Sequence, residues 1–118
     1  MMAKLERSPQ PARMEAVSRD ALVQAALQEI NQNYREASLS NVARAYGVSL
    51  AYVSECVRAQ TGRTYKELLQ KHRMETAARL LRRSDLNIQQ IIAQVGYENT
   101  SYFYRLFHER YGLSPREY

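Results

Sequence analysis

The sequence of 118 residues has few of the features of a secreted, membrane-spanning or metal-binding protein. It has one cysteine, Cys56, so it can form neither an intramolecular disulfide nor a zinc cluster of several thiolates. No apolar run approaches the roughly 20 residues that cross a bilayer, and the N-terminal segment lacks the apolar stretch of a secretory signal. We therefore expect a cytoplasmic protein that makes no membrane contact.

Signals for β-structure are also scarce. Only 4 residues are glycine, and no Asn-Gly or Asp-Gly dipeptide separates alternating apolar and polar segments. Apolar residues recur instead at helical spacing. After Ser18, a candidate N-cap, this spacing predicts a first helix with an apolar face made of Val23, Ala26, Leu27, Ile30 and Tyr34. We expect an all-α chain of about seven helices.

Acidic residues are outnumbered, 12 to 17, which gives a formal net charge of +5 and a pI near 9.6. All the cations except Lys4, Lys66 and Lys71 are arginines. A small basic protein is attracted to polyanions, and the planar guanidinium fork suits phosphates and guanine edges. The charge therefore favours a nucleic acid as partner.

The chain contains an internal repeat. Two segments agree at a constant offset of 49, namely Leu39-x-x-Val42-Ala43-x-x-Tyr46-Gly47-Val48 and Ile88-x-x-Ile91-Ile92-x-x-Val95-Gly96-Tyr97. Beyond the glycine the offset becomes 50, where Tyr52-Val53-x-x-Cys56-Val57 matches Tyr102-Phe103-x-x-Leu106-Phe107 and Gly62 matches Gly112. One extra residue is thus expected in the second turn.

Each copy has the pattern of a helix-turn-helix: a short helix, a tight turn at glycine, a second helix and a terminating glycine. Gly47 and Gly96 are expected to adopt positive φ, and four polar residues are candidate N-caps: Ser38, Ser49, Asn87 and Asn99. Between the copies, residues 65–83 predict one uninterrupted helix whose apolar face is supplied by Leu68, Leu69, Ala77, Leu80 and Leu81.

These elements divide the chain into four expected segments. Residues 1–17, which contain Pro9 and Pro11, are predicted to form a flexible arm or linker remnant. The first helix-turn-helix subdomain is expected at 18–63, a linking helix at 64–84 and the second subdomain at 85–118.

The C-terminal residues resemble the signature of the AraC/XylS family of bacterial transcription regulators. The resemblance rests on Arg73-Met74-x-x-Ala77-x-x-Leu80-Leu81, on Ile88-x-x-Ile91-x-x-x-Val95-Gly96-Tyr97-x-Asn99-x-Ser101-Tyr102-Phe103-x-Arg105-x-Phe107, and on Gly112-x-Ser114-Pro115-x-x-Tyr118. It implies a sequence-specific DNA-binding domain in which two helix-turn-helix units, joined by a long helix, place their second helices in successive major grooves. Activation is the commoner role in this family, with RNA polymerase as a partner of the parent regulator. Because one chain contains two such units, it can cover two DNA half-sites without dimerising, and we expect the isolated domain to be a monomer.

The period of each second helix predicts which residues face DNA. Val53, Cys56 and Val57 in the first copy, and Phe103, Leu106 and Phe107 in the second, are expected to face the core. The candidate DNA-binding residues lie on the opposite faces or at the helix N-termini: Leu50, Ala51, Ser54, Glu55 and Arg58, then Asn99, Thr100, Ser101, Tyr102, Tyr104, Arg105 and His108.

The two copies differ in chemistry. Thr100, Ser101 and Arg105 give the second copy hydrogen-bond donors for guanine or phosphate, so it is expected to be the stronger reader. In the first copy, Glu55 occupies the position of Arg105. It either accepts from a cytosine amino group or, as we favour, repels the phosphate backbone.

Several residues have structural explanations. Five aromatic residues are expected on core faces: Tyr46, Tyr97, Phe103, Phe107 and Tyr111. Tyr102 and Tyr104 remain open between packing and contact with DNA, and Arg79, Arg82 and Arg83 remain open between solvent and phosphate. Cys56 is expected to be a small buried hydrophobe.

No catalytic constellation stands out, so an enzyme is not expected, and neither a cofactor nor a metal is predicted. His72 and His108 are far apart in the sequence and lack a third ligand. The alternative to DNA binding is a helical adaptor that contacts proteins of the transcription machinery.

Overall fold

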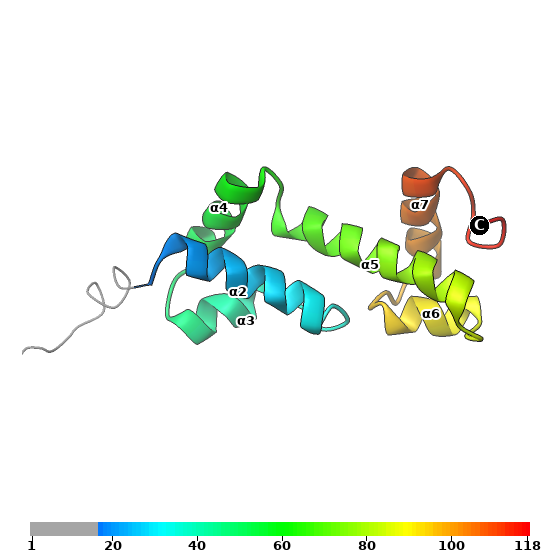
Figure 1. Cartoon of the computed structure of the whole chain (residues 1–118), viewed down its shortest axis with the longest axis horizontal. Coiled ribbons are helices and arrows are strands. Elements are labelled where there is room, and N and C mark those ends of the chain that lie inside the picture. Colours follow the sequence, from blue (N-terminus) through cyan, green and yellow to red (C-terminus); the bar gives the residue numbers. More distant parts are fainter. Residues whose placement is uncertain (1–16) are drawn as a thin grey trace, which may run out of the picture. The chain divides into compact units, whose positions relative to one another are not determined.

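A computed structural model describes residues 17–118, which contain six α-helices and no strand. The helices are α2 (Arg19–Gln32), α3 (Leu39–Tyr46), α4 (Leu50–Thr61), α5 (Tyr65–Arg83), α6 (Ile88–Gln94) and α7 (Thr100–Tyr111) (Figure 1). The all-α expectation is confirmed. The arm expected at 1–17 lies outside the described residues except for Val17, and the expected count of about seven helices concerned the whole chain. No helix in 17–118 is long and apolar enough to cross a membrane.

The described residues form two compact units. The first comprises residues 17–29 with Ser38–Tyr65, and the second comprises Ile30–Ala37 with Lys66–Tyr118. Each unit therefore contains one helix-turn-helix, α3–α4 in the first and α6–α7 in the second. The long helix α5, apart from its first residue, belongs to the second unit.

The core of the first unit collects the apolar faces of its three helices. α2 contributes Leu22, Val23 and Ala26, α3 contributes Val42 and Ala43, and α4 contributes Val53, Cys56 and Val57. Polar contacts add to this packing, because the Glu29 carboxylate accepts hydrogen bonds from the Ser38 backbone N–H (3.3 Å) and from Asn41 Nδ2 (3.0 Å). Glu29 thus connects the end of α2 to the start of α3.

The core of the second unit is built around two phenylalanines of α7. Phe103 and Phe107 are fully buried, with ring centroids 5.9 Å apart. They pack with six other buried residues: Met74, Ala77, Ala78, Ile91, Ile92 and Val95. The leucines predicted to form the apolar face of α5 are only half-buried, whereas Met74, Ala77 and Ala78 are buried, so the core contact is centred one turn before the pair Leu80–Leu81.

The two helix-turn-helix turns begin with the same pattern of backbone hydrogen bonds. Val48 N–H donates to Ala43 O (3.1 Å) in the first copy, and Tyr97 N–H donates to Ile92 O (3.1 Å) in the second. Together with the N–H groups of Gly47 (φ 69°) and Gly96 (φ 101°), which donate three residues back, these bonds form a Schellman motif in each turn. The expected positive φ values are confirmed.

The four N-caps predicted for the two helix-turn-helix copies are also confirmed, and so is Ser18, whose Oγ accepts a hydrogen bond from Ala21 N–H (3.0 Å). The side chains of Ser38, Ser49, Asn87 and Asn99 each accept a hydrogen bond from a backbone N–H in the first turn of the following helix. Since the Schellman turns match at an offset of 49 and the caps Ser49 and Asn99 differ by 50, the extra residue of the second turn is Glu98, which is exposed.

The prediction that Tyr46 faces the core is wrong. Its side chain is 36% exposed, whereas Val95 at the matching position is fully buried. Tyr46 is the last residue of α3. A tyrosine carries a polar hydroxyl that favours contact with water, whereas valine has no polar side-chain group. The other aromatic residues of that prediction are buried, as for Phe103 and Phe107, or half-buried, as for Tyr97 and Tyr111.

Candidate nucleic-acid interface

In the first unit, helix α4 presents one buried and one exposed face. Its ends are fixed by the Ser49 cap and by Gly62 (φ 78°), whose N–H donates to Arg58 O. Val53, Cys56 and Val57 are at most 1% exposed. The five candidates on the other face are all exposed: Leu50, Ala51, Ser54, Glu55 and Arg58. Among these five side chains the hydrogen-bond donors are the Ser54 hydroxyl and the Arg58 guanidinium, and Glu55 adds a negative charge.

In the second unit, helix α7 also has one buried face, and its outer face carries more polar and aromatic side chains than that of α4. It is capped by Asn99 and ends at Gly112 (φ 72°). The candidates Asn99, Ser101, Arg105 and His108 are exposed, whereas Thr100, Tyr102 and Tyr104 are half-buried. Leu106, predicted to face the core as Cys56 does, is only half-buried and packs at the edge of the core. Asn99 Oδ1 accepts from Tyr102 N–H (2.9 Å), so this oxygen is committed to the helix.

The side chain of Tyr102 is held by neighbours within the second unit. Its hydroxyl accepts a hydrogen bond from Gln70 Nε2 of α5 (2.9 Å). Its ring meets the ring of Tyr97 edge to face, with centroids 5.9 Å apart. Contacts within the protein therefore hold the Tyr102 side chain in place, and its hydroxyl points to α5.

Arg105 lies next to Tyr102 on the outer face of α7. Its guanidinium carbon is 5.0 Å from the centre of the Tyr102 ring, within the range of a cation–π interaction. The two residues are three apart on one helix, the spacing at which side chains meet. The exposed Arg105 is thus supported by a fixed aromatic ring.

Other cations of the second unit have protein partners that the sequence did not predict. The Arg82 guanidinium donates to the Tyr118 hydroxyl and lies 5.3 Å from the centre of that ring. Arg79 Nη2 reaches Thr76 Oγ1 at 3.5 Å, and Thr76 is a buried polar residue of the core. Arg83 is exposed. Whether any of them contacts phosphate stays a prediction.

One cation beside α7 was missed among the candidate site residues. A pocket of about 220 Å³ is lined by Tyr104, Ser114 and Arg116, which places an exposed arginine next to a candidate groove-facing tyrosine. The turn that carries Arg116 is closed by reciprocal bonds, Ser114 N–H to Glu117 Oε1 (3.0 Å) and Glu117 N–H to Ser114 Oγ (3.3 Å). A capping box in Ser114-Pro115-Arg116-Glu117 was the available signal.

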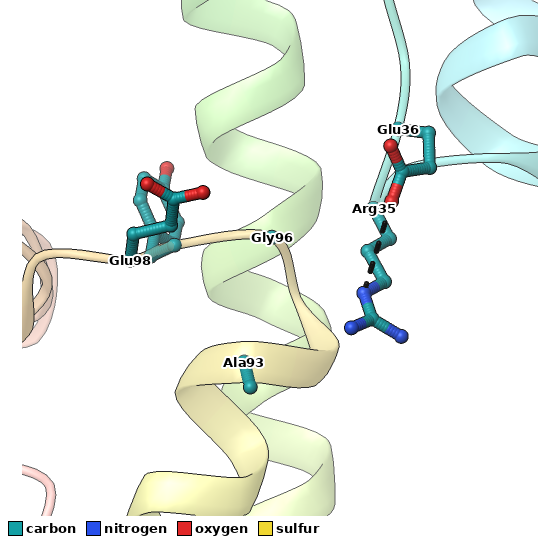
Figure 2. Close-up of a pocket in the computed structure, with 6 residues that line it drawn as sticks. Arg35, Glu36, Ala93, Gly96 and Glu98 are labelled. Atoms are coloured by element: carbon teal, nitrogen blue, oxygen red, sulfur yellow. Dashed lines mark ion pairs between the residues drawn. The ribbon is translucent and has the colours of Figure 1, made fainter.

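A second pocket lies at the turn between α6 and α7 (Figure 2). It measures about 230 Å³ and is lined by Arg35, Glu36, Ala93, Gly96, Tyr97 and Glu98. Its one ion pair, between Arg35 and Glu36 at 4.0 Å, joins side chains that are 62% and 75% exposed, so it contributes little stability. Burial raises the pKa of the Tyr97 hydroxyl above its ordinary value, against the opposing effect of the Arg73 guanidinium.

Comparison with known proteins identifies the family of this arrangement. A family model described as a helix-turn-helix domain matches residues 42–118, which include both helix-turn-helix turns. The chain belongs to the AraC/XylS-type helix-turn-helix family. The sequence resemblance is confirmed. The chain is a DNA-binding domain of the AraC type, and this family of transcription-factor DNA-binding domains is non-enzymatic.

Relatives of AraC type agree with this assignment. The chain is 30% identical over 93 residues to the transcriptional activator PerA of Escherichia coli O127:H6, covering 76% of this chain and 31% of PerA. The chain thus spans less than a third of that relative. Among solved structures, the C-terminal domain of AraT, a response regulator from Geobacillus stearothermophilus, superposes with a TM-score of 0.76 at 34% identity, covering 86% of this chain and 84% of that domain.

The fold also recurs in the DNA-binding domain of AdpA, a global transcriptional factor that was solved in complex with a target DNA. The TM-score is 0.72 at 21% identity, covering 82% of this chain and 87% of that one. At this identity the likeness concerns the fold alone.

Proposed function

We propose that the chain binds double-stranded DNA sequence-specifically and that the N-terminal halves of α4 and α7 enter the major groove. The observation that carries this proposal is the matched construction of the two helices. Each follows a Schellman turn, begins at a polar N-cap, and buries apolar residues on one side while the candidate DNA-binding residues of the other side are exposed or half-buried. In a helix-turn-helix the N-terminal residues of the second helix approach the base edges.

We further propose that the second unit binds DNA more strongly than the first. Arg105 is exposed and supported by the Tyr102 ring, whereas the matching Glu55 is an exposed carboxylate. Arginine can donate two hydrogen bonds to guanine or bind phosphate, and a carboxylate meets a dense row of phosphate charges. The half-sites should therefore contribute unequally to affinity.

The test is selection of preferred sites from random duplex DNA with the whole chain, followed by footprinting on the selected site. If both units engage, protection should cover two half-sites about 10–10.5 bp apart on one face of the duplex. Protection of a single half-site would contradict engagement by both units. Recovery of no preferred sequence would overturn sequence-specific binding altogether.

The salt dependence of the affinity separates DNA binding from the adaptor alternative. Release of counterions from phosphates makes log K fall linearly with log salt concentration, with a slope near −0.9 per phosphate contacted. A DNA-binding chain should give such a line with a slope of several units, whereas an adaptor should show no measurable affinity for duplex DNA. Contact with RNA polymerase, a role in activation and a monomeric isolated domain remain predictions from the family resemblance.

Replacement of Glu55 tests the proposed weakness of the first unit. Glu55→Ala should strengthen binding to selected and scrambled duplexes alike, by up to about fivefold, because the variant removes one like-charge repulsion. The measurement is a fluorescence titration of both duplexes at one salt concentration. Glu109→Ala is the matched control, since it removes an exposed carboxylate from the last turn of α7. Weaker binding of the selected duplex alone would mean instead that Glu55 accepts a hydrogen bond from cytosine.

A further inference from the structure

Two arginines and two tyrosines form a chain of contacts that leads from α5 to the outer face of α7 in the second unit, with the tyrosines in the middle and an arginine at each end. The Arg73 guanidinium carbon lies 5.2 Å from the centre of the Tyr97 ring. Tyr97 meets Tyr102 edge to face at 5.9 Å, and Arg105 lies 5.0 Å from the centre of the Tyr102 ring. The innermost member is itself anchored, because Arg73 Nε donates to the backbone carbonyl of Tyr34 (2.9 Å). The outermost member is exposed and is a candidate for base contact.

Tyr102 is the member whose position decides where the Arg105 guanidinium lies. Gln70, which comes from α5, fixes the hydroxyl end of the Tyr102 ring with a part-buried hydrogen bond of 2.9 Å. Tyr97 fixes the ring from the side, with an angle of 66° between the ring planes. Two independent contacts therefore define the orientation of the Tyr102 ring, and neither of them involves DNA.

An exposed arginine without such a ring samples many side-chain conformations. A guanidinium over an aromatic ring loses part of that freedom before binding, while the N–H groups at its edge stay available. A side chain that is held in its bound conformation before DNA arrives binds more tightly, because less conformational entropy is lost when the contact forms. The benefit is larger for a bidentate contact with one base than for a general attraction to phosphate, since only the former requires a defined guanidinium plane.

We propose that Gln70 and Tyr102 are positioning residues for DNA specificity, which hold the guanidinium of Arg105 in the plane required to read a guanine edge. This inference rests on the proposed DNA-binding function. It assigns to Gln70, a residue of the long helix and outside the helix-turn-helix, an effect on which sequence is bound. It also makes Tyr102 a residue that acts through Arg105 instead of contacting a base itself.

The experiment measures discrimination, defined as the ratio of Kd for a scrambled duplex to Kd for the selected duplex. Gln70→Leu and Tyr102→Phe break the same hydrogen bond from opposite ends, and both leave an aromatic ring at position 102. Each should lower discrimination by about two- to tenfold, the effect of one net hydrogen bond, with little change in affinity for the scrambled duplex. Their double variant should lower it no further than either alone.

The decisive comparison uses the Arg105→Ala background. If Gln70 and Tyr102 act through Arg105, then Gln70→Leu and Tyr102→Phe should leave the discrimination of the Arg105→Ala protein unchanged. Gln94→Leu is the matched control, since it removes an exposed carboxamide from α6 of the same unit and should have no effect in either background. Thermal unfolding of each variant, followed by circular dichroism, checks that the measured protein is folded.

Two results would overturn the inference while leaving the proposed function intact. One is wild-type discrimination in Gln70→Leu when Arg105→Ala has lost it. The other is an equal loss on Gln70→Leu in the presence and absence of Arg105, which would mean that the hydrogen bond acts through the fold and not through the guanidinium. Equal affinity of the wild-type chain for both duplexes would instead overturn sequence-specific binding itself, and this inference with it.

Discussion

Gly96→Ala should destabilise the second unit by about 3 kcal/mol or more, because it combines backbone strain with a steric clash. Gly96 has a φ of 101°, which side chains of L-residues rarely allow. A Cβ at this position would lie 2.8 Å from the backbone oxygen of Arg35 and 3.0 Å from the Arg73 guanidinium carbon. Neither neighbour can retreat freely, since the guanidinium donates to Tyr34 O at 2.9 Å and to Arg35 O at 3.3 Å. Figure 2 shows Gly96 on the turn between α6 and α7 and Arg35 on the neighbouring chain segment.

Gly62→Ala is the matched control for this prediction. Gly62 also has a left-handed conformation, with φ 78°, but a Cβ there would meet no atom within 4 Å. Gly62→Ala should therefore lower the free energy of unfolding only by the cost of the backbone strain, about 1–2 kcal/mol. Urea unfolding of both variants and the wild type, followed by circular dichroism, measures the difference in free energy of unfolding. Equal losses in the two variants would show that the surroundings of Gly96 yield and that the close approach contributes nothing.

Arg105→Ala should weaken binding to the selected duplex by about 1–3 kcal/mol, roughly 5- to 150-fold, if the guanidinium reads a guanine edge. The affinity for scrambled duplex should then fall much less, and the base preference should relax at one position of the site. If Arg105 binds phosphate instead, affinity should fall almost equally for all sequences and the salt slope should shrink by about one unit. Titrations of both duplexes at several salt concentrations distinguish these results.

Arg110→Ala provides the matched control for the charge. Arg110 is an exposed arginine in the last turn of the same helix, so its replacement removes the same charge away from the N-terminal half of α7. It should change the affinity for the selected and scrambled duplexes by the same small factor. If Arg105→Ala and Arg110→Ala behave alike on every duplex, a specific role for Arg105 is wrong.

Much of the fold could be predicted from the sequence because its signals are local. A polar residue before a helix and a glycine after it encode backbone hydrogen bonds within a few residues, which is why the caps Ser49 and Asn99 and the positive φ of Gly47 and Gly96 agree with expectation. The repeat also placed the extra residue in the second turn. The buried faces of α4 and α7 followed from the helical period for the same reason, except at Leu106, which is only half-buried.

The contacts that hold the candidate site could not be predicted, because they join residues distant in the sequence. Nothing in the residues around Gln70 indicates that it donates to Tyr102, which is 32 positions later. Tyr46 and Val95 occupy matching positions of the repeat, yet one is exposed and the other buried, since burial depends on what the neighbouring helices leave free. Likewise, nothing in the residues around Arg82 indicates that it contacts Tyr118, which is 36 positions later.

The burial of Cys56 has a consequence for experiments on this chain. Cys56 is the only thiol of the sequence, it belongs to α4 in the first unit, and it is 1% exposed. A thiol reagent can therefore react only after that unit opens, so the rate of modification reports opening of the first unit around Cys56. The unaltered chain thus carries its own probe of whether α4 is held on DNA, because engagement of α4 would slow modification and a free α4 would not.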